Sequence, residues 1–178
     1  VYAQLRKHGH EDAASRVARA VGTRLRLAAT VIAASGVLLA RPLVDVLAWG
    51  FAPEYRELTI QLVRILFPGI ALLVLGAWCL GVLNSHRKFF LPYASPVLWN
   101  VALITTAILA GRRFHGHDDT VVVWLAWAVV IGSAAQFLVQ LPAVVVLLRG
   151  IRPSLAFRDT HVVQTLRAFV PILLSRGS

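Results

Sequence analysis

Cysteine and acidic residues are scarce in this chain. Its one cysteine, Cys79, has no partner for an intrachain disulfide, and its position inside an apolar run indicates a small packing residue rather than a redox centre. Asp and Glu together number 8 among 178 residues. Adjacent acidic pairs occur only at 11–12 and 118–119, so the sequence offers few loops on which a membrane glycosyltransferase could build an acidic, metal-binding active site.

Recognisable catalytic motifs are missing as well. The sequence contains no nucleophile elbow, no glycine loop that would cradle a phosphate and no metalloprotease histidine pair. A metal site needs three or four converging ligands, and the nearest approach to one is the group His115, His117, Asp118 and Asp119. Its spacing matches no helix-borne ligand motif. We therefore interpret these residues as a solvated turn, and we expect neither an enzyme nor a bound metal or cofactor.

Apolar residues, in contrast, dominate the composition. Hydrophobic residues make up 58 % of the chain and the mean hydropathy is +0.72, whereas soluble domains are about 45–50 % apolar. In a soluble protein the net charge of +10 would suggest a nucleic-acid partner, but here the cations lie between apolar runs and form no continuous patch. The composition predicts an integral membrane protein that binds no nucleic acid.

The uncharged runs predict an all-α membrane protein, a polytopic helical bundle. At ~1.5 Å per residue, the runs 65–83 and 91–111 are each long enough to cross ~30 Å of hydrocarbon. Pro42 interrupts the first apolar pattern, and the aromatic residues after it predict a short interfacial segment before the second span. The predicted organisation of 1–178 is a single fragment of a transmembrane domain, with a cytoplasmic loop at 1–24, spans at about 25–40, 65–83, 91–111 and 120–148, and a partial span at 168–178.

The ends of the sequence predict a piece of a longer protein. The chain opens on Val1 with a polar segment that lacks the apolar region of a signal peptide, and it stops within an apolar run that begins near Ala168. Most Lys and Arg fall in 1–26, in the turn at 84–90 and in 149–167. Because short cytoplasmic loops are enriched in these cations, we expect these three segments to face the cytoplasm.

Polar residues inside the predicted spans are candidates for a function. Gly132, Ser133, Gln136 and Gln140 occupy a single helical stripe, which should face protein or a hydrated cavity because lipid cannot satisfy the glutamine amides. For this stripe, hydrogen bonds between helices are favoured over direct substrate contact. Arg176 is a charge inside a presumed span, which costs ~2.5–3.5 kcal/mol even on lenient insertion scales. It should therefore face a cavity or a partner.

The turn between the second and third spans is the most distinctive segment of the chain. Asn84 can cap or bridge this turn. Arg87 and Lys88 follow it, and they either contact lipid phosphate or serve as ordinary topogenic charges. In the preceding span, Gly69 and Gly76 lie on one helical face, which predicts close packing against another helix.

The segment 63–104 resembles a known family, the MurJ/MviN lipid II flippases of the MOP exporter superfamily. The family pattern has a Phe-Pro step that opens a helix, a Leu-Asn step at a cytoplasmic turn, an aromatic residue, a proline and a helical asparagine. These features are matched, in order, by Phe67–Pro68, Leu83–Asn84, Phe89, Pro96 and Asn100. The glutamine-rich segment 132–142 and both ends of the chain also resemble this family, so the resemblance covers nearly the whole sequence.

The resemblance implies part of the N-terminal lobe of such a flippase, covering helices three to seven of fourteen. The whole transporter would move lipid II, a polyprenyl-pyrophosphate-linked glycopeptide, outward across the bacterial cytoplasmic (inner) membrane for cell-wall synthesis. Expected partners are lipid II, membrane lipids and the cell-wall synthesis machinery. The arginines prominent in the family lie in helices outside this range, so the fragment alone is not expected to transport.

The sequence leaves two alternatives open. A flippase for another polyprenyl-linked glycan, such as an O-antigen unit, would share the first-lobe pattern, and a non-transporting scaffold subunit would share the packed helices. The chain departs from the family pattern at Arg176, where an apolar or small residue is expected, and in the bulk of Trp78 and Trp99. The candidate substrate-binding or cavity residues are Asn84, Arg87, Lys88, Asn100, Gln136, Gln140 and Arg176.

Overall fold

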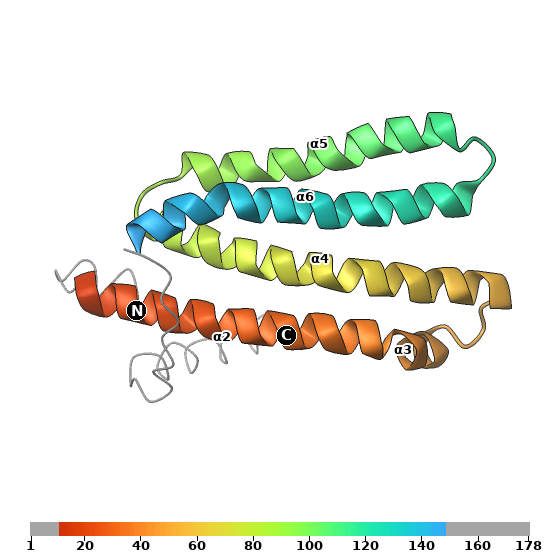
Figure 1. Cartoon of the computed structure of the whole chain (residues 1–178), viewed down its shortest axis with the longest axis horizontal. Coiled ribbons are helices and arrows are strands. Elements are labelled where there is room, and N and C mark those ends of the chain that lie inside the picture. The colour runs from red at the N-terminus through yellow and green to blue at the C-terminus, as the bar shows by residue number, and fades with distance from the viewer. Residues whose placement is uncertain (1–10, 149–178) are drawn as a thin grey trace, which may run out of the picture.

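Five helices make up residues 11–148, the part of the chain that the computed structural model describes. In chain order they are α2 (Glu11–Leu38), α3 (Ala40–Leu47), α4 (Pro53–Ser85), α5 (Phe90–Arg113) and α6 (Asp118–Leu147), and this part contains no strand (Figure 1). Ala18–Leu38 within α2 and the whole of α4, α5 and α6 are long and apolar enough to cross a membrane. The prediction of an all-α, multi-pass membrane protein is confirmed.

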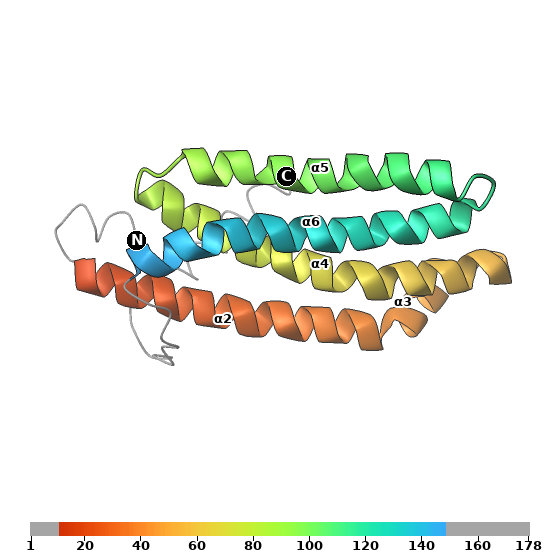
Figure 2. The same cartoon turned by 45° about the horizontal axis from the view of Figure 1, so that its top comes forward.

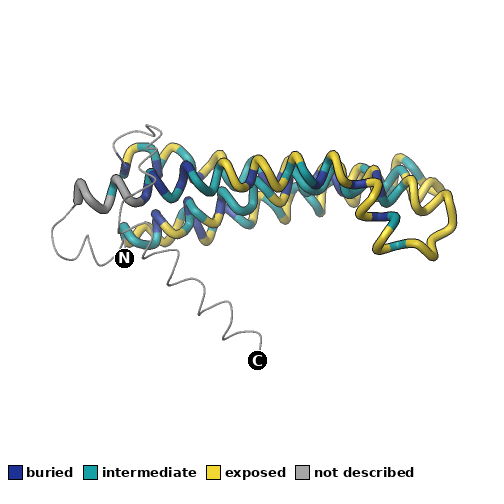
Figure 3. Tube along the Cα trace, turned by 90° about the horizontal axis from the view of Figure 1, so that it is seen from below, coloured by how far each residue is buried: buried dark blue, intermediate teal, exposed yellow. Residues whose placement is uncertain are grey.

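The long helices lie side by side, with α4 between α2 and α6. α4 packs most extensively on α6 and also along α2, while α5 packs mainly on α6 (Figure 2). One buried cluster joins α2, α4 and the C-terminal end of α6: Ala18, Cys79, Val82, Leu83, Val144 and Leu148. Most other residues are half-buried or exposed (Figure 3), and large apolar side chains stay uncovered on every long helix. In a membrane protein, lipid tails rather than water cover such a surface.

The turns of the chain gather at two opposite ends of the bundle. The N-terminal end of α2, the α4–α5 turn and the C-terminal end of α6 lie at one end, whereas α3 and the α5–α6 turn lie at the other (Figures 1 and 2). The basic start of α2 and the Asn84 turn therefore share an end, as the sequence predicts. The loop from Arg149 and the partial span at 168–178 lie outside the described residues.

The helices extend beyond the predicted spans. α2 begins at Glu11, inside the segment 1–24 that was predicted as a loop, and α4 begins at Pro53 and not near Ile65. An apolar run marks only the part that hydrocarbon covers, whereas a helix continues as long as its backbone hydrogen bonds do. The first two turns of α4 carry exposed charges that do not interrupt the helix, at Glu54, Arg56 and Glu57.

The first part of the predicted interfacial segment folds as the short helix α3, and its aromatic residues follow in the turn 48–52 and at the start of α4. Pro42 lies in its first turn, where the missing N–H costs no helical hydrogen bond. Val44 is buried against Ile60 of α4, and two ion pairs join the helices: Arg41 with Glu57 at 2.7 Å, and Arg56 with Asp45. These pairs are largely exposed, so they orient α3 more than they stabilise it. The outer surface of α3 suits the head-group boundary because it leaves several apolar side chains uncovered: Leu43, Val46 and Leu47.

Bulky side chains on one helix lie against glycines on the next. Trp78 of α4 packs against Gly22 of α2 and donates its indole N–H to the Ala18 carbonyl at 3.3 Å. Trp99 of α5 packs against Gly132 of α6, where an added Cβ would lie 2.8 Å from Trp99 Cδ1 and 3.0 Å from its Cα. The two tryptophans that add bulk to closely packed helices are thus accommodated by glycines on their neighbours.

Candidate functional site

The turn between α4 and α5 closes in a Schellman motif. The N–H of Arg87 donates to the Asn84 carbonyl and the N–H of Lys88 donates to the Leu83 carbonyl, both at 3.0 Å. The motif needs a left-handed residue at Arg87, whose φ is 56°. Glycine usually fills this position because it has no Cβ to clash, and a side chain here costs roughly 1–2 kcal/mol. The turn between α4 and α5 therefore holds an arginine at a position where glycine would relax the backbone.

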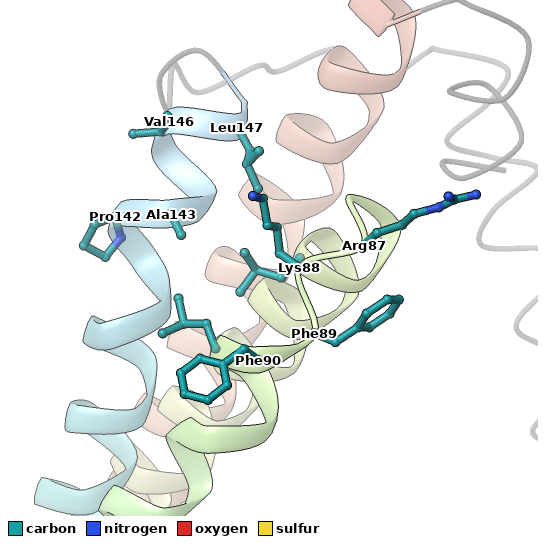
Figure 4. Close-up of a pocket in the computed structure, with 10 residues that line it drawn as sticks. Arg87, Lys88, Phe89, Phe90, Pro142, Ala143, Val146 and Leu147 are labelled. Carbon is teal, nitrogen blue, oxygen red and sulfur yellow. The ribbon is translucent and has the colours of Figure 1, made fainter.

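A cavity of about 790 Å³ opens beside this turn, between the start of α5 and the end of α6 (Figure 4). Arg87 and Lys88 lie at its rim, and both side chains are exposed. Lys88 extends toward Leu147, whereas Arg87 points away from α6 (Figure 4). The rest of the lining is apolar: Leu83, Phe89, Phe90, Leu91, Pro142, Ala143, Val146 and Leu147. Two of the predicted site residues thus lie together at the mouth of one apolar cavity.

Gln140 joins α6 to α5 through a chain of hydrogen bonds. Its Nε2 donates to Ser95 Oγ at 2.7 Å and to the Gln136 carbonyl at 3.3 Å, and Ser95 Oγ donates to the Pro92 carbonyl at 3.2 Å. In a regular helix the Pro92 carbonyl would accept from residue 96, but Pro96 has no N–H. The Ser95 hydroxyl replaces that donor. Gln140 is therefore an interhelical contact, the role that the sequence favours for it.

The rest of the glutamine stripe also faces protein. Gly132 and Ser133 are buried, and Gln136 is half-buried, with its Nε2 close to Gly76 of α4. The Ser133 hydroxyl donates to the Val129 carbonyl within α6 at 2.6 Å. The stripe thus faces protein, one of the two environments that the sequence predicts, and its part in substrate contact stays a prediction.

Three buried polar atoms of α4, α5 and α6 have no hydrogen-bond partner among the described residues: Asn84 Oδ1, Trp99 Nε1 and Gln140 Oε1. A buried donor or acceptor that is left unpaired costs ~1–3 kcal/mol, so few such atoms occur in folded proteins. Of the predicted site residues, Asn84 and Gln140 therefore carry hydrogen-bonding capacity that the described part of the chain does not use.

Asn100 and Arg176 do not join these groups. Asn100 is exposed on α5, and its Nδ2 donates to the Pro96 carbonyl of its own helix at 3.2 Å. Arg176 lies outside the described residues. Ser95, in contrast, was not predicted as a site residue. The signal that could have found it is a serine directly before a proline within a membrane helix, because such hydroxyls often satisfy the carbonyl that the proline frees.

The histidine and aspartate turn lies at the other end of the bundle. Its side chains are exposed, and Gly116 between the two histidines has a φ of 80°. Asp118 and Asp119 form the first turn of α6, where carboxylates are stabilised by the positive end of the helix dipole. Within residues 11–148, no group of three or more His, Cys, Asp or Glu could hold a metal ion. His115 and His117 thus belong to a surface turn, and the two aspartates to a helix start.

Comparison with known proteins decides the family. The sequence profile described as lipid II flippase MurJ matches residues 1–178, the whole chain. The chain belongs to the MurJ lipid II flippase family. The resemblance that rests on the segment 63–104 is therefore confirmed. No solved structure matches the chain significantly.

Relatives within the MurJ family are similar along most of this chain. The lipid II flippase MurJ of Burkholderia cenocepacia is 34 % identical over 96 % of this chain and 34 % of its own length. The probable lipid II flippase MurJ of Buchnera aphidicola (subsp. Acyrthosiphon pisum) is 29 % identical over 80 % of this chain and 28 % of its own length. The probable lipid II flippase MurJ of Bdellovibrio bacteriovorus is 29 % identical over 93 % of this chain and 32 % of its own length. The chain spans about a third of the length of these curated relatives.

Proposed function

We propose that this chain is part of the N-terminal lobe of a transporter that flips lipid II across the bacterial cytoplasmic membrane for peptidoglycan synthesis. The observation that carries the proposal is the match of all 178 residues to the MurJ family. Four helices that can cross a membrane support it, as does the naming of the Burkholderia cenocepacia relative as a lipid II flippase. These relatives favour lipid II over another polyprenyl-linked glycan as the cargo.

A lipid-linked precursor poses a physical problem that a helical bundle can solve. Its pyrophosphate and sugars cannot enter hydrocarbon without a large loss of hydration, whereas its polyprenyl chain is already soluble there. A flippase therefore has to offer the head group a polar cleft while the chain stays in lipid. The polar groups that line such a cleft have to belong to helices that turn them away from the bilayer.

Within this chain, we rank the candidate cavity residues by how free their polar atoms are. Gln136 is half-buried, and Asn84 Oδ1 has no partner within residues 11–148, so both come before Gln140, whose amide nitrogen is held by Ser95. Asn100 is the weakest candidate because it is exposed and bonded to its own helix. We propose that Arg176 pairs with the pyrophosphate, since arginine matches phosphate oxygens through two parallel N–H groups.

We propose further that the start of α2, the α4–α5 corner and the loop after Leu148 face the cytoplasm, because most Lys and Arg of the chain lie there. In this arrangement α3 and the α5–α6 turn face the outside of the inner membrane. The chain then serves transport and not catalysis, and enzymes of cell-wall synthesis are candidate partners.

Complementation tests the proposal. The full-length gene of which this chain is a part, expressed in a bacterium depleted of its own lipid II flippase, should restore growth and cell shape. Rescue of a mutant that cannot export another polyprenyl-linked glycan, without rescue of the depleted strain, would assign the chain to that second class of flippase. Rescue of neither strain, with the protein present in the membrane fraction, would favour a non-transporting scaffold.

A further inference from the structure

The cavity beside the α4–α5 turn has a lining that matches one chemical class of ligand. We propose that it binds an anionic phospholipid of the surrounding bilayer, with an acyl chain between α5 and α6 and the lipid phosphate on Lys88, next to the positive charge of Arg87 (Figure 4). This site is distinct from the hydrogen-bond chain of Gln140 and Ser95, and it does not depend on the proposed transport.

The interior of the cavity suits hydrocarbon. Its volume of about 790 Å³ falls within the ~300–1,000 Å³ typical of small-molecule sites. Apart from Arg87 and Lys88, every lining residue within 11–148 is apolar. A charged or sugar-bearing group among these side chains would lose its hydration without gaining hydrogen bonds, whereas an acyl chain that enters from the bilayer exchanges one apolar environment for another.

The lining also becomes more exposed from the back of the cavity to its mouth. Leu83 at the end of α4 is fully buried, while Phe90 is 84 % exposed and Val146 is 76 % exposed. These two rim residues come from α5 and α6, which form the two sides of the opening. A flexible chain can therefore enter from the side of the bundle and reach the buried cluster without moving a helix.

Lys88 is placed for a phosphate at the mouth, and Arg87 adds a second positive charge at the same turn although its side chain points away from α6 (Figure 4). Arg87 and Lys88 follow the end of one membrane-length helix and precede the next, which is the depth of lipid phosphates when both helices cross a bilayer. Basic pockets between membrane helices on the cytoplasmic side bind acidic lipid head groups. Outside α2, the acidic residues of the described part all lie at the opposite end of the bundle: Asp45, Glu54, Glu57, Asp118 and Asp119.

The backbone at Arg87 gives an independent reason to assign a ligand here. A left-handed residue after a helix is ordinarily glycine, yet this corner holds an arginine at a φ of 56°. Strain of this kind is concentrated at functional sites, where the side chain has a purpose. A soluble phosphate would use the cations and leave the apolar cavity unused, so only a ligand with both a phosphate and a hydrocarbon chain satisfies the whole lining.

Lipid titration of the purified protein, followed by native mass spectrometry, tests the site. Phosphatidylglycerol should bind more tightly than phosphatidylcholine. Lys88→Gln should weaken the binding of phosphatidylglycerol about fivefold, the factor expected for one cation near a charged membrane surface. Arg87→Gly should weaken it by a similar factor without lowering the melting temperature, because glycine relaxes the left-handed backbone. A loss of binding in this variant can therefore not come from misfolding.

Two further variants separate the apolar part of the site from the charged part. Val146→Trp changes an exposed position at the rim of the cavity. The larger side chain should block the mouth and weaken the binding of phosphatidylglycerol, although both cations remain. Arg113→Gln is the matched control. Arg113 also ends an apolar helix beside a cavity, of about 300 Å³, but at the other end of the bundle, so this variant should leave phosphatidylglycerol binding unchanged.

The proposal is overturned by any of four results. An unchanged lipid preference in Lys88→Gln and Arg87→Gly would mean that these cations do not bind the lipid phosphate. Unchanged binding in Val146→Trp would mean that the cations act as a charged surface without a site. If Arg113→Gln weakened the binding of phosphatidylglycerol as much as Lys88→Gln does, the effect would come from the net charge of the protein and not from a site. Tighter binding of undecaprenyl phosphate than of phosphatidylglycerol, with the same sensitivity to Val146→Trp, would assign the cavity to a polyprenyl lipid instead.

Discussion

Gln140 on α6 donates a hydrogen bond of 2.7 Å to the hydroxyl of Ser95 on α5. The same hydroxyl donates to the carbonyl of Pro92, which has lost its helical donor because residue 96 is a proline. One serine thus repairs a proline break and supplies the acceptor for the neighbouring helix. The continuity of α5 and its contact with α6 depend on the same side chain.

Ser95→Ala should lower the free energy of unfolding by about 1–2 kcal/mol, because it leaves the Pro92 carbonyl unpaired and removes the better acceptor of the Gln140 amide. Gln140→Leu should cost less, since it also removes an oxygen that has no partner among the described residues. The double variant should cost less than the sum of the two, as expected when two residues share a hydrogen bond. Denaturant unfolding in detergent micelles measures all three, and strict additivity would contradict the shared bond.

Gly132→Ala should destabilise the bundle by about 1–3 kcal/mol, because the new Cβ would lie 3.0 Å from Trp99 Cα, a backbone atom that cannot turn aside. Gly81→Ala on α4 is the control. No atom of the described part of the chain lies within 4 Å of a Cβ at that position, and alanine is favoured over glycine inside a helix by roughly 0.5–1 kcal/mol. The melting temperatures of the two variants should move in opposite directions. A shared upward shift would show that the contact between α5 and α6 is loose.

Comparing Trp78→Phe with Trp99→Phe measures how much an indole hydrogen bond contributes to the free energy of unfolding. Trp78 donates to the Ala18 carbonyl, whereas Trp99 Nε1 is buried without a partner among the described residues. Trp78→Phe should therefore cost about 1 kcal/mol more than Trp99→Phe, which removes an unsatisfied donor. Thermal unfolding of the two variants checks the order. The reverse order would mean that Trp99 has a partner outside residues 11–148.

The arrangement across the membrane can be tested by cysteine labelling. In a Cys79→Ala background, Lys88→Cys and Arg113→Cys each place a single thiol at an exposed position at opposite ends of the bundle. A membrane-impermeant maleimide should label Arg113→Cys in intact spheroplasts and Lys88→Cys only after lysis. Labelling of both thiols from the same face would contradict the span assignment.

The existence and order of the membrane helices could be predicted from the sequence, but their ends could not. Runs without charge have one stable form in hydrocarbon, because only a helix satisfies the backbone there. Outside the hydrocarbon that constraint disappears, so the exposed charges near Pro53 say nothing about where α4 begins. For the same reason, the start of the apolar run near Leu25 did not reveal the earlier helical turns of α2, which begins at Glu11.

The candidate site could be predicted only in part, because its contacts join different helices. The glutamine stripe was visible from its spacing on α6, yet its acceptor, Ser95, lies on α5 and no periodicity connects the two. The cations of the corner could be read directly from the chain. The left-handed backbone of Arg87 could not, since the usual sign of a Schellman motif is a glycine that this turn lacks.

Prolines divide the bundle into parts of different stiffness. α4, α5 and α6 each contain an internal proline, at Pro68, Pro96 and Pro142, whereas the sequence of α2 contains none. α2 therefore resembles a continuous rod, and the other three helices carry points at which they bend at low cost. Because Ser95 donates a hydrogen bond to the carbonyl that Pro96 leaves free, α5 should bend less than α4 and α6 during a conformational change. Bending should therefore concentrate at Pro68 and Pro142, and α2 should move as a rigid body.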